Sequence, residues 1–198
     1  MTASEMVAEG RRVILAEAAA VVALADRIGE DFARACVLIA NADRIVVCGL
    51  GKSGHIARKI ASTLSSTGTP ATFLHAGEAL HGDLGAVRRG DVAVVLSNSG
   101  GGYDIARLAE ALVCARIPIV AMTGRSDSTL ASAAAVVLDC STDEACPLGL
   151  APTSSSTTAL VLGDALAMTA MALSGFGADD FAERHPGGSL GAATRVAV

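Results

Sequence analysis

Five short apolar segments, rich in β-branched residues, recur along the chain and constrain its fold more than any other feature. They lie at 44–48, 71–74, 92–96, 117–122 and 135–139. Helical segments at about 53–66, 102–115 and 127–133 separate most of them. Strands that alternate with helices form parallel βαβ units, and strands apolar on both faces are buried on both faces. The pattern predicts an α/β fold, a three-layer αβα sandwich around a five-stranded, parallel, doubly wound (flavodoxin-like) sheet.

Helical patterns flank this series at both ends. Apolar residues near the 3.6-residue period predict one or two amphipathic helices over residues 4–40, with a break at Gly29. We therefore expect an N-terminal helical segment, 1–40, that packs on the domain, followed by the main domain, 41–198. A long, mostly apolar helix is predicted at about 156–174 and ends at Gly175. Because this helix has so little polar face, we expect it to be buried, between subunits.

Composition narrows the class of partner. The 198 residues suit one α/β domain, and 52% hydrophobic against 18% charged residues argue against disorder. A net charge of -5 without any basic run argues against a nucleic-acid partner. Residues 1–12 lack a signal pattern, and no apolar run approaches about 18 residues. We expect a cytoplasmic protein without a membrane partner, which holds any anionic ligand by local groups.

Glycine-rich polar loops follow the first and third predicted strands, at 49–54 and 97–102. Ligands of such sheets bind beyond the carboxyl ends of the strands. In the first loop, Lys52 and Ser53 stand at a helix N-terminus, where free N–H groups and the helix dipole favour an anion. In the second, Ser97, Asn98 and Ser99 offer hydroxyl and amide groups to a phosphate. Together the two loops predict a phosphorylated ligand.

The first loop also resembles two commoner nucleotide motifs, and both fail. A phosphate-binding P-loop requires a glycine where this chain has Val46. The dinucleotide fingerprint G-x-G-x-x-G is met by Gly49, Gly51 and Gly54, but residues 66–77 contain no carboxylate to bind the ribose. The sequence therefore excludes a nucleotide triphosphatase and disfavours a nicotinamide cofactor.

Further candidate side chains lie in two other segments. His75, Glu78, His81 and Asp83 fall close together and could hold a metal or carry protons, although their spacing is not that of a zinc protease. Glu144 directly precedes a proline-stiffened, largely apolar loop, which is unlike a solvated acidic face. Residues alone leave the roles of these groups open.

The motifs taken together resemble the SIS (sugar isomerase) domain of arabinose-5-phosphate isomerases. The resemblance runs from about 44 to 192 and is most specific at 144–155 (EACPLGLAPTSS) and at 185–188 (HPGG); the other matching segments are 51–55, 66–70, 75–79, 81–85 and 97–100. It implies reversible conversion of D-ribulose 5-phosphate to D-arabinose 5-phosphate, a precursor of Kdo in lipopolysaccharide or capsule. The same resemblance implies that no redox cofactor is required.

The resemblance also implies site residues. The catalytic positions fall on Lys52, Asp104, Glu144 and His185. Substrate-contacting positions fall on Gly68, Thr69, His75 and His81. The predicted substrate-binding set also includes the loop residues Gly51, Ser53, Ser97, Asn98 and Ser99, together with Ser141 and Thr142. His75 also matches a position that can take a divalent metal, as an inhibitor. Similar enzymes are tetramers that place the histidine of the 185–188 motif in a neighbour's pocket, so we expect a homotetramer.

The chain departs from the family at two points. Residues 101–104 read Gly-Gly-Tyr-Asp, where the family has glutamate, two small hydroxyl residues and a second glutamate. A phosphate-side hydroxyl is lost at Gly102, and the carboxylate at Asp104 is one methylene shorter. The chain also ends soon after the 185–188 motif, where many members continue into a pair of CBS domains. We expect a form with the SIS domain alone, or one shortened from a longer protein.

The isomerisation requires a base for the carbon-bound proton, an acid or cation at the carbonyl, and a grip on the phosphate. Glu144 or His185 is the carbon base and the other donates to oxygen or opens the ring; the sequence leaves this choice open. Lys52 stabilises the developing charge, while Asp104 orients Lys52 or a sugar hydroxyl. Two alternatives remain: an isomerase of another phosphosugar, and a non-catalytic module that senses a sugar phosphate.

Overall fold

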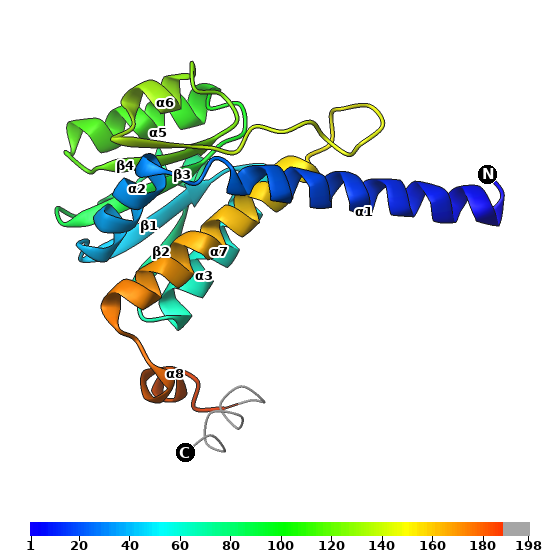
Figure 1. Cartoon of the computed structure of the whole chain (residues 1–198). Coiled ribbons are helices and arrows are strands. Elements are labelled where there is room, and N and C mark those ends of the chain that lie inside the picture. Colours follow the sequence, from blue (N-terminus) through cyan, green and yellow to red (C-terminus); the bar gives the residue numbers. More distant parts are fainter. Residues whose placement is uncertain (188–198) are drawn as a thin grey trace.

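The computed structural model, which describes residues 1–187, contains one five-stranded parallel sheet (Figure 1). Its strands are β1 (Arg44–Gly49), β2 (Ala71–His75), β3 (Asp91–Leu96), β4 (Ile119–Thr123) and β5 (Val136–Asp139). Their order is β2-β1-β3-β4-β5, which is the flavodoxin-like order. The predicted fold class is confirmed, and the order reverses direction between β1 and β3, where such folds bind ligands.

Helices cover both faces of this sheet. One face carries α2 (Glu30–Ala40), α3 (Gly51–Ser66) and α7 (Ser154–Ser174). The opposite face carries α4 (Ala76–Ala79), α5 (Tyr103–Cys114) and α6 (Thr129–Ala133). Alternate residues of β1 supply the two cores: Ile45 and Val47 face the first layer, and Val46 and Cys48 face the second. This alternation explains why the strands are apolar throughout.

The predicted strands and helices after residue 40 end within two residues of the observed ones. Three short elements were not predicted: α4, the 3₁₀ helix η1 (Asp83–Ala86) and α8 (Ala178–Arg184). Each has seven residues or fewer, and an apolar periodicity needs two or more turns to show itself.

Helix α1 (Ala3–Ala25) extends well beyond the rest of the fold (Figure 1). Leu24 is its one buried residue, whereas Ile14 and Val22 are 69% and 71% exposed. Only its C-terminal part lies against α7, so most of its apolar face has no cover within one chain. The break that we expected near Gly29 does separate α1 from α2, and the division of the chain at residue 40 stays a prediction.

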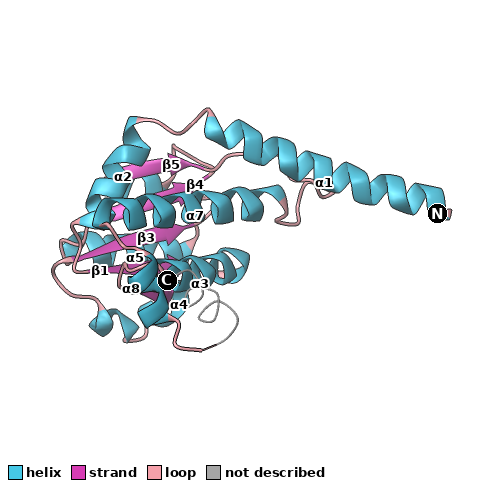
Figure 2. Ribbon diagram, turned by 60° about the horizontal axis from the view of Figure 1, so that its bottom comes forward, coloured by secondary structure: helices cyan, strands magenta, loops and turns pink. Residues whose placement is uncertain are grey.

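Helix α7 runs the whole depth of the domain (Figure 2). Its 21 residues span about 30 Å at the rise of an α-helix. It begins at the carboxyl end of the sheet and ends near the C-terminus of α3, where a β-carbon on Gly68 would lie 2.3 Å from Cδ2 of Phe176. Among the described residues it alone is long and apolar enough to cross a membrane, and here it packs on α3, α1 and α2.

Candidate functional site

The two glycine-rich loops meet at the carboxyl end of the sheet. They border a cleft of about 350 Å³ between β1 and β3, and Pro152 closes one side of it. Its polar lining consists of Lys52, Ser53, Ser97, Asn98 and Ser99. The predicted phosphate-binding residues of the two loops therefore share one concave surface.

Both helices that leave this cleft have open N-termini. No side chain caps α3, which follows Leu50, or α5, which follows Gly102. Within residues 1–187 the backbone N–H groups of Gly51, Lys52 and Ser53 have no protein acceptor. Gly49 allows α3 to start this close to β1, because a β-carbon there would lie 2.8 Å from the carbonyl carbon of Ser53. Free N–H groups and two helix dipoles thus face the cleft and suit an anion.

Lys52 lines the cleft, and Asp104 lies on another helix next to the lining residue Ile105. Lys52 is exposed in the first turn of α3, and Asp104 is half-buried in the first turn of α5. Neither side chain makes an ion pair within the part of the chain that the structure describes. Both roles expected for Asp104, orientation of Lys52 and orientation of a sugar hydroxyl, stay predictions.

Glu144 lies at the N-terminus of α7 and is held by several hydrogen bonds. Its Oε2 accepts from the N–H of Thr153 at 2.7 Å, from the Thr153 hydroxyl at 3.0 Å and from the N–H of Ser155 at 3.2 Å. Its Oε1 accepts from the Ser155 hydroxyl. Burial raises the pKa of this carboxyl, but the hydrogen bonds from Ser155 and Thr153 outweigh burial and leave the pKa below its ordinary value. Glu144 is therefore an ionised side chain that fills a helix N-terminus.

The histidine-containing segment adjoins the cleft at the same end of the sheet. His75 ends β2 opposite Gly49 of β1, and its Nδ1 accepts from the N–H of Glu78 at 3.4 Å. His81 follows α4 and is exposed. No group of three or more potential metal ligands occurs within residues 1–187, so the inhibitory metal at His75 stays a prediction.

Ser141 and Thr142 follow β5 at the outer edge of the sheet. This strand is two places from β3, or roughly 10 Å at the usual strand spacing. The N–H of Ser141 donates to Asp139, and its carbonyl accepts from Arg27. The two residues share the carboxyl end of the sheet with the cleft but do not line it.

Three predicted site residues lie at the opposite end of the domain. Gly68 and Thr69 connect α3 to the amino end of β2, and His185 follows α8 beyond the far end of α7 (Figure 1). The Nδ1 of His185 is 2.8 Å from the carbonyl oxygen of Phe181, and the two rings stack at 3.9 Å. Gly188, the last residue of that motif, lies outside the described residues. A single chain therefore cannot bring His185 to its own cleft without a large rearrangement.

Sequence reasoning missed the groups that build the surroundings of Glu144 and the cleft. Thr153 and Ser155 hold the carboxylate, and Leu50 and Pro152 line the cleft. The specific 144–155 segment was the available signal, but it gives no indication of which of its side chains contact one another.

Known proteins resemble the chain in both sequence and structure. The SIS domain model matches residues 38–169. The arabinose 5-phosphate isomerase KdsD of Pseudomonas aeruginosa is 51% identical over 189 residues, which cover 94% of this chain and 58% of that protein. The arabinose 5-phosphate isomerase GutQ of Escherichia coli K12 is 49% identical over 185 residues, covering 92% and 58%. The chain thus spans less than two thirds of the length of these curated relatives.

A solved structure also resembles this chain. The structure of a protein from E. coli CFT073, in complex with arabinose 5-phosphate, matches with a TM-score of 0.90 at 36% identity, covering 94% of this chain and 100% of that one.

Proposed function

Because the chain belongs to the SIS domain family, we propose that it is an aldose–ketose isomerase that interconverts D-ribulose 5-phosphate and D-arabinose 5-phosphate. The observation that carries this proposal is the cleft in which Lys52 and the 97–99 loop meet between two open helix N-termini. Relatives that are 49–51% identical and carry this activity in their names support it, as does the arabinose 5-phosphate complex of a similar structure.

Different groups around the cleft are proposed to bind different parts of the substrate. Hydroxyl groups of Ser53, Ser97 and Ser99 and the free N–H groups of α3 bind the phosphate. The Lys52 ammonium lies at the rim, where it stabilises the negative charge that develops on the carbonyl oxygen as the enediol forms. Asp104 binds a sugar hydroxyl from the first turn of α5.

The environment of Glu144 bears on the choice of carbon base. General base catalysis is most effective when the pKa of the base lies near the working pH. Since its hydrogen bonds keep the pKa of Glu144 below the ordinary value, this carboxylate is ready to accept a proton but is a weak base. We therefore assign removal of the C1 proton of the ketose, and its return to C2, to His185. Glu144 then carries the hydroxyl proton: its carboxylate accepts the proton of the O1 hydroxyl and delivers it to O2, the carbonyl oxygen of the ketose.

We propose that each site is completed by a second subunit of a homotetramer. In one chain Lys52 lies at the end of the sheet where α7 begins, whereas His185 lies beyond the other end of α7, a helix about 30 Å long. The uncovered apolar residues of α1, including Ile14 and Val22, also need a partner surface. We place the enzyme in the cytoplasm, without a required cofactor, without nucleic-acid or membrane partners, and in the supply of Kdo.

Subunit mixing tests the shared site. Lys52→Ala and His185→Ala proteins should each be nearly inactive, whereas co-expressed mixed oligomers should regain part of the activity. Recovery is expected because some sites then combine an intact Lys52 with an intact His185 from another chain. Purified oligomers that contain both chains, each with its own tag, are the sample to assay. If they stay inactive, His185 serves its own chain.

The function itself is tested by product analysis. The purified protein, incubated with D-ribulose 5-phosphate in the presence of a chelator, should give D-arabinose 5-phosphate, detected by NMR. The departure at Gly102, where a hydroxyl is missing, makes other phosphosugars the necessary comparison. Faster turnover of a hexulose or heptose phosphate would reassign the substrate. Binding of a sugar phosphate without turnover of any would favour a sensing module.

A further inference from the structure

The turn between β4 and α6, residues 123–128, is hydrogen-bonded to the loop that carries Asn98 and Ser99. The carbonyl of Asn98 accepts from the N–H of Gly124 at 3.0 Å and from the Thr123 hydroxyl at 3.4 Å. Two residues later, the carbonyl of Gly100 accepts from the N–H of Leu130, at 3.0 Å, in the first turn of α6. Three donors from one turn and its helix thus hold two carbonyls of the cleft loop.

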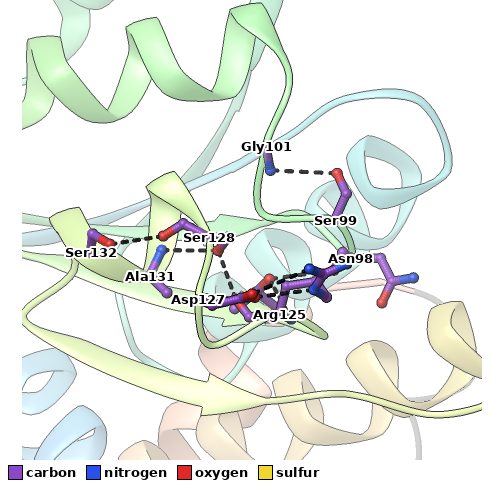
Figure 3. Close-up of polar contacts among 9 residues, drawn as sticks. Asn98, Ser99, Gly101, Arg125, Asp127, Ser128, Ala131 and Ser132 are labelled. Atoms are coloured by element: carbon purple, nitrogen blue, oxygen red, sulfur yellow. Dashed lines mark hydrogen bonds and ion pairs between the residues drawn. The ribbon is translucent and has the colours of Figure 1, made fainter.

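The fit between turn and loop is tight enough to require glycine on both sides. A β-carbon on Gly124 would lie 2.6 Å from the side-chain oxygen of Asn98, and one on Gly100 would lie 2.0 Å from the Ser128 hydroxyl. Gly100 also has a φ of 58°, which side chains rarely adopt. Figure 3 shows the turn from Arg125 to Ser128 lying against the loop that bears Asn98 and Ser99. The loop therefore has little freedom to rotate.

The turn is itself built firmly. Thr123 is 1% exposed, and its Oγ1 also accepts from the N–H of Arg125 at 3.2 Å. The Ser128 hydroxyl donates to the Arg125 carbonyl at 2.7 Å and accepts from the N–H of Ala131 at 3.2 Å (Figure 3). The outer side of the turn carries the exposed Arg125–Asp127 ion pair. The turn that holds the Asn98 loop is thus itself fixed by hydrogen bonds.

The hydrogen bonds from the turn to the loop set the direction of one backbone donor. In a trans peptide, the carbonyl of one residue and the N–H of the next point in opposite directions, and no described peptide bond is cis. Because the Asn98 carbonyl points at the turn, the Ser99 N–H points away from the turn. Ser99 is one of the residues that line the cleft. Within residues 1–187 this N–H has no protein acceptor. By contrast, the N–H of Gly101 is occupied by the Ser99 hydroxyl at 3.4 Å.

We propose that Thr123 and Gly124 are positioning residues that aim the Ser99 N–H at the phosphate of the substrate. This inference rests on the proposed function for the identity of the ligand, but not for the geometry. An oriented N–H needs no rearrangement when the phosphate arrives, which is the advantage of a pre-formed oxyanion site. Neither residue touches the substrate; both act through the Asn98 carbonyl.

Two substitutions at Thr123 separate orientation from packing. Thr123→Val keeps the volume and removes the hydroxyl, whereas Thr123→Ser keeps the hydroxyl and removes a methyl group. Loss of the hydroxyl, which donates to the Asn98 carbonyl and accepts from the N–H of Arg125, should weaken binding of D-arabinose 5-phosphate about fivefold in Thr123→Val, with Thr123→Ser close to wild type. The matched control is Ser132→Ala, which removes a hydrogen bond to the Ser128 carbonyl, at 3.1 Å, on the far side of the same turn. That control should bind as wild type does.

Calorimetry with D-arabinose 5-phosphate and with inorganic phosphate gives the decisive readings, and steady-state kinetics should show the KM rising while kcat stays constant. Gly124→Ala, which forces a methyl group against Asn98, should weaken binding of both ligands further. Equal binding by Thr123→Val and wild type, or a loss in Thr123→Ser as large as in Thr123→Val, would overturn the proposal. So would a loss for the sugar phosphate with none for inorganic phosphate.

The same measurements separate this inference from the proposed function. A wild-type protein that binds the sugar phosphate without isomerising it refutes the isomerase, and the binding comparison between the Thr123 variants still decides the role of the turn. A wild-type protein that binds neither ligand overturns both.

Discussion

Two helices begin at the same end of the sheet, and their N-termini are treated in opposite ways. At α3 no side chain caps the first turn, the N–H groups of residues 51–53 have no partner in the described chain, and Lys52 adds a positive charge. At α7 the N–H groups of Thr153 and Ser155 are already taken by the Glu144 carboxylate. The same preference of a helix N-terminus for negative charge is left open for a ligand in one place and is satisfied internally in the other.

The open N-terminus of α3 is thus available to bind a ligand, whereas the filled N-terminus of α7 stabilises the fold. The N–H groups of an open N-terminus stay in water until an anion binds. Their favourable interaction with negative charge therefore contributes to the free energy of ligand binding. A filled N-terminus contributes to folding, and it fixes Thr153, the neighbour of the Pro152 that closes one side of the cleft. We therefore expect changes at α3 to act on catalysis and binding, and changes around Glu144 to act on both activity and stability.

The largest effect is expected at Lys52. Lys52→Met removes the one positive charge among the described residues that line the cleft and should lower kcat/KM about 10³-fold with little change in the free energy of unfolding. The matched control is Lys59→Met on the same helix, whose ammonium pairs with Asp164 of α7 away from the cleft. That control should stay within about twofold in activity. A similar loss in both variants would mean that the α3 N-terminus is not the site of the substrate's charge.

Glu144→Gln should have the next largest effect. The amide keeps the shape but removes the charge, and its NH₂ group faces donors of Thr153 or Ser155. We expect kcat to fall about 10²-fold and the free energy of unfolding to fall as well. Glu110→Gln, at an exposed ion pair of α5, is the control. A change confined to KM would make Glu144 a binding group, and a loss of stability with full activity would leave it as a cap only.

The pH dependence of stability sharpens the comparison further. Because the pKa of Glu144 is lower in the folded chain than its ordinary value, its charge stabilises the fold. This stabilisation is complete above the unfolded-state pKa of about 4.3 and is lost as the pH falls through the lower folded-state pKa. Urea titrations should show the difference between wild type and Glu144→Gln shrinking below about pH 4. A difference that persists unchanged there would mean that the charge is not its source.

The elements of the sheet could be predicted because burial on both faces leaves a plain signal. Segments such as Val92–Leu96 are apolar without interruption, so their limits follow from the polar residues beside them. The apolar period of α1 predicted a helix correctly, but it could not tell which surface covers it. Ile14 is exposed in the single chain, because periodicity reports that a face is apolar and not what it packs against.

Of the site, the sequence predicted only which loops meet at the carboxyl ends of the strands. The loops after β1 and β3 had to converge, since parallel strands place their carboxyl ends at one edge. The bonds from Thr153 and Ser155 to Glu144, and from the 123–128 turn to Asn98, join residues 9 to 26 positions apart with no periodic pattern between them. The placement of Gly68 and His185 at the far end follows from the direction of α3 and α7, which a motif match does not encode.

The smallest effect is expected from a pair of neighbouring serines, and it tests the filled N-terminus most finely. Ser155→Ala removes the hydroxyl that donates to Oε1 of Glu144 but leaves the backbone donor in place. Ser154→Ala, also at a buried position, removes a hydroxyl that accepts from the N–H of Ala145 at 3.2 Å and does not touch the carboxylate. Each should lower the free energy of unfolding by about 1 kcal/mol, but only Ser155→Ala should raise the pKa of Glu144, as followed by NMR of its side-chain carboxyl carbon. If both variants raise that pKa alike, the α7 N-terminus acts on Glu144 through its overall structure. If neither does, the charge of Glu144 is held by the donors that remain, the backbone N–H groups and the Thr153 hydroxyl.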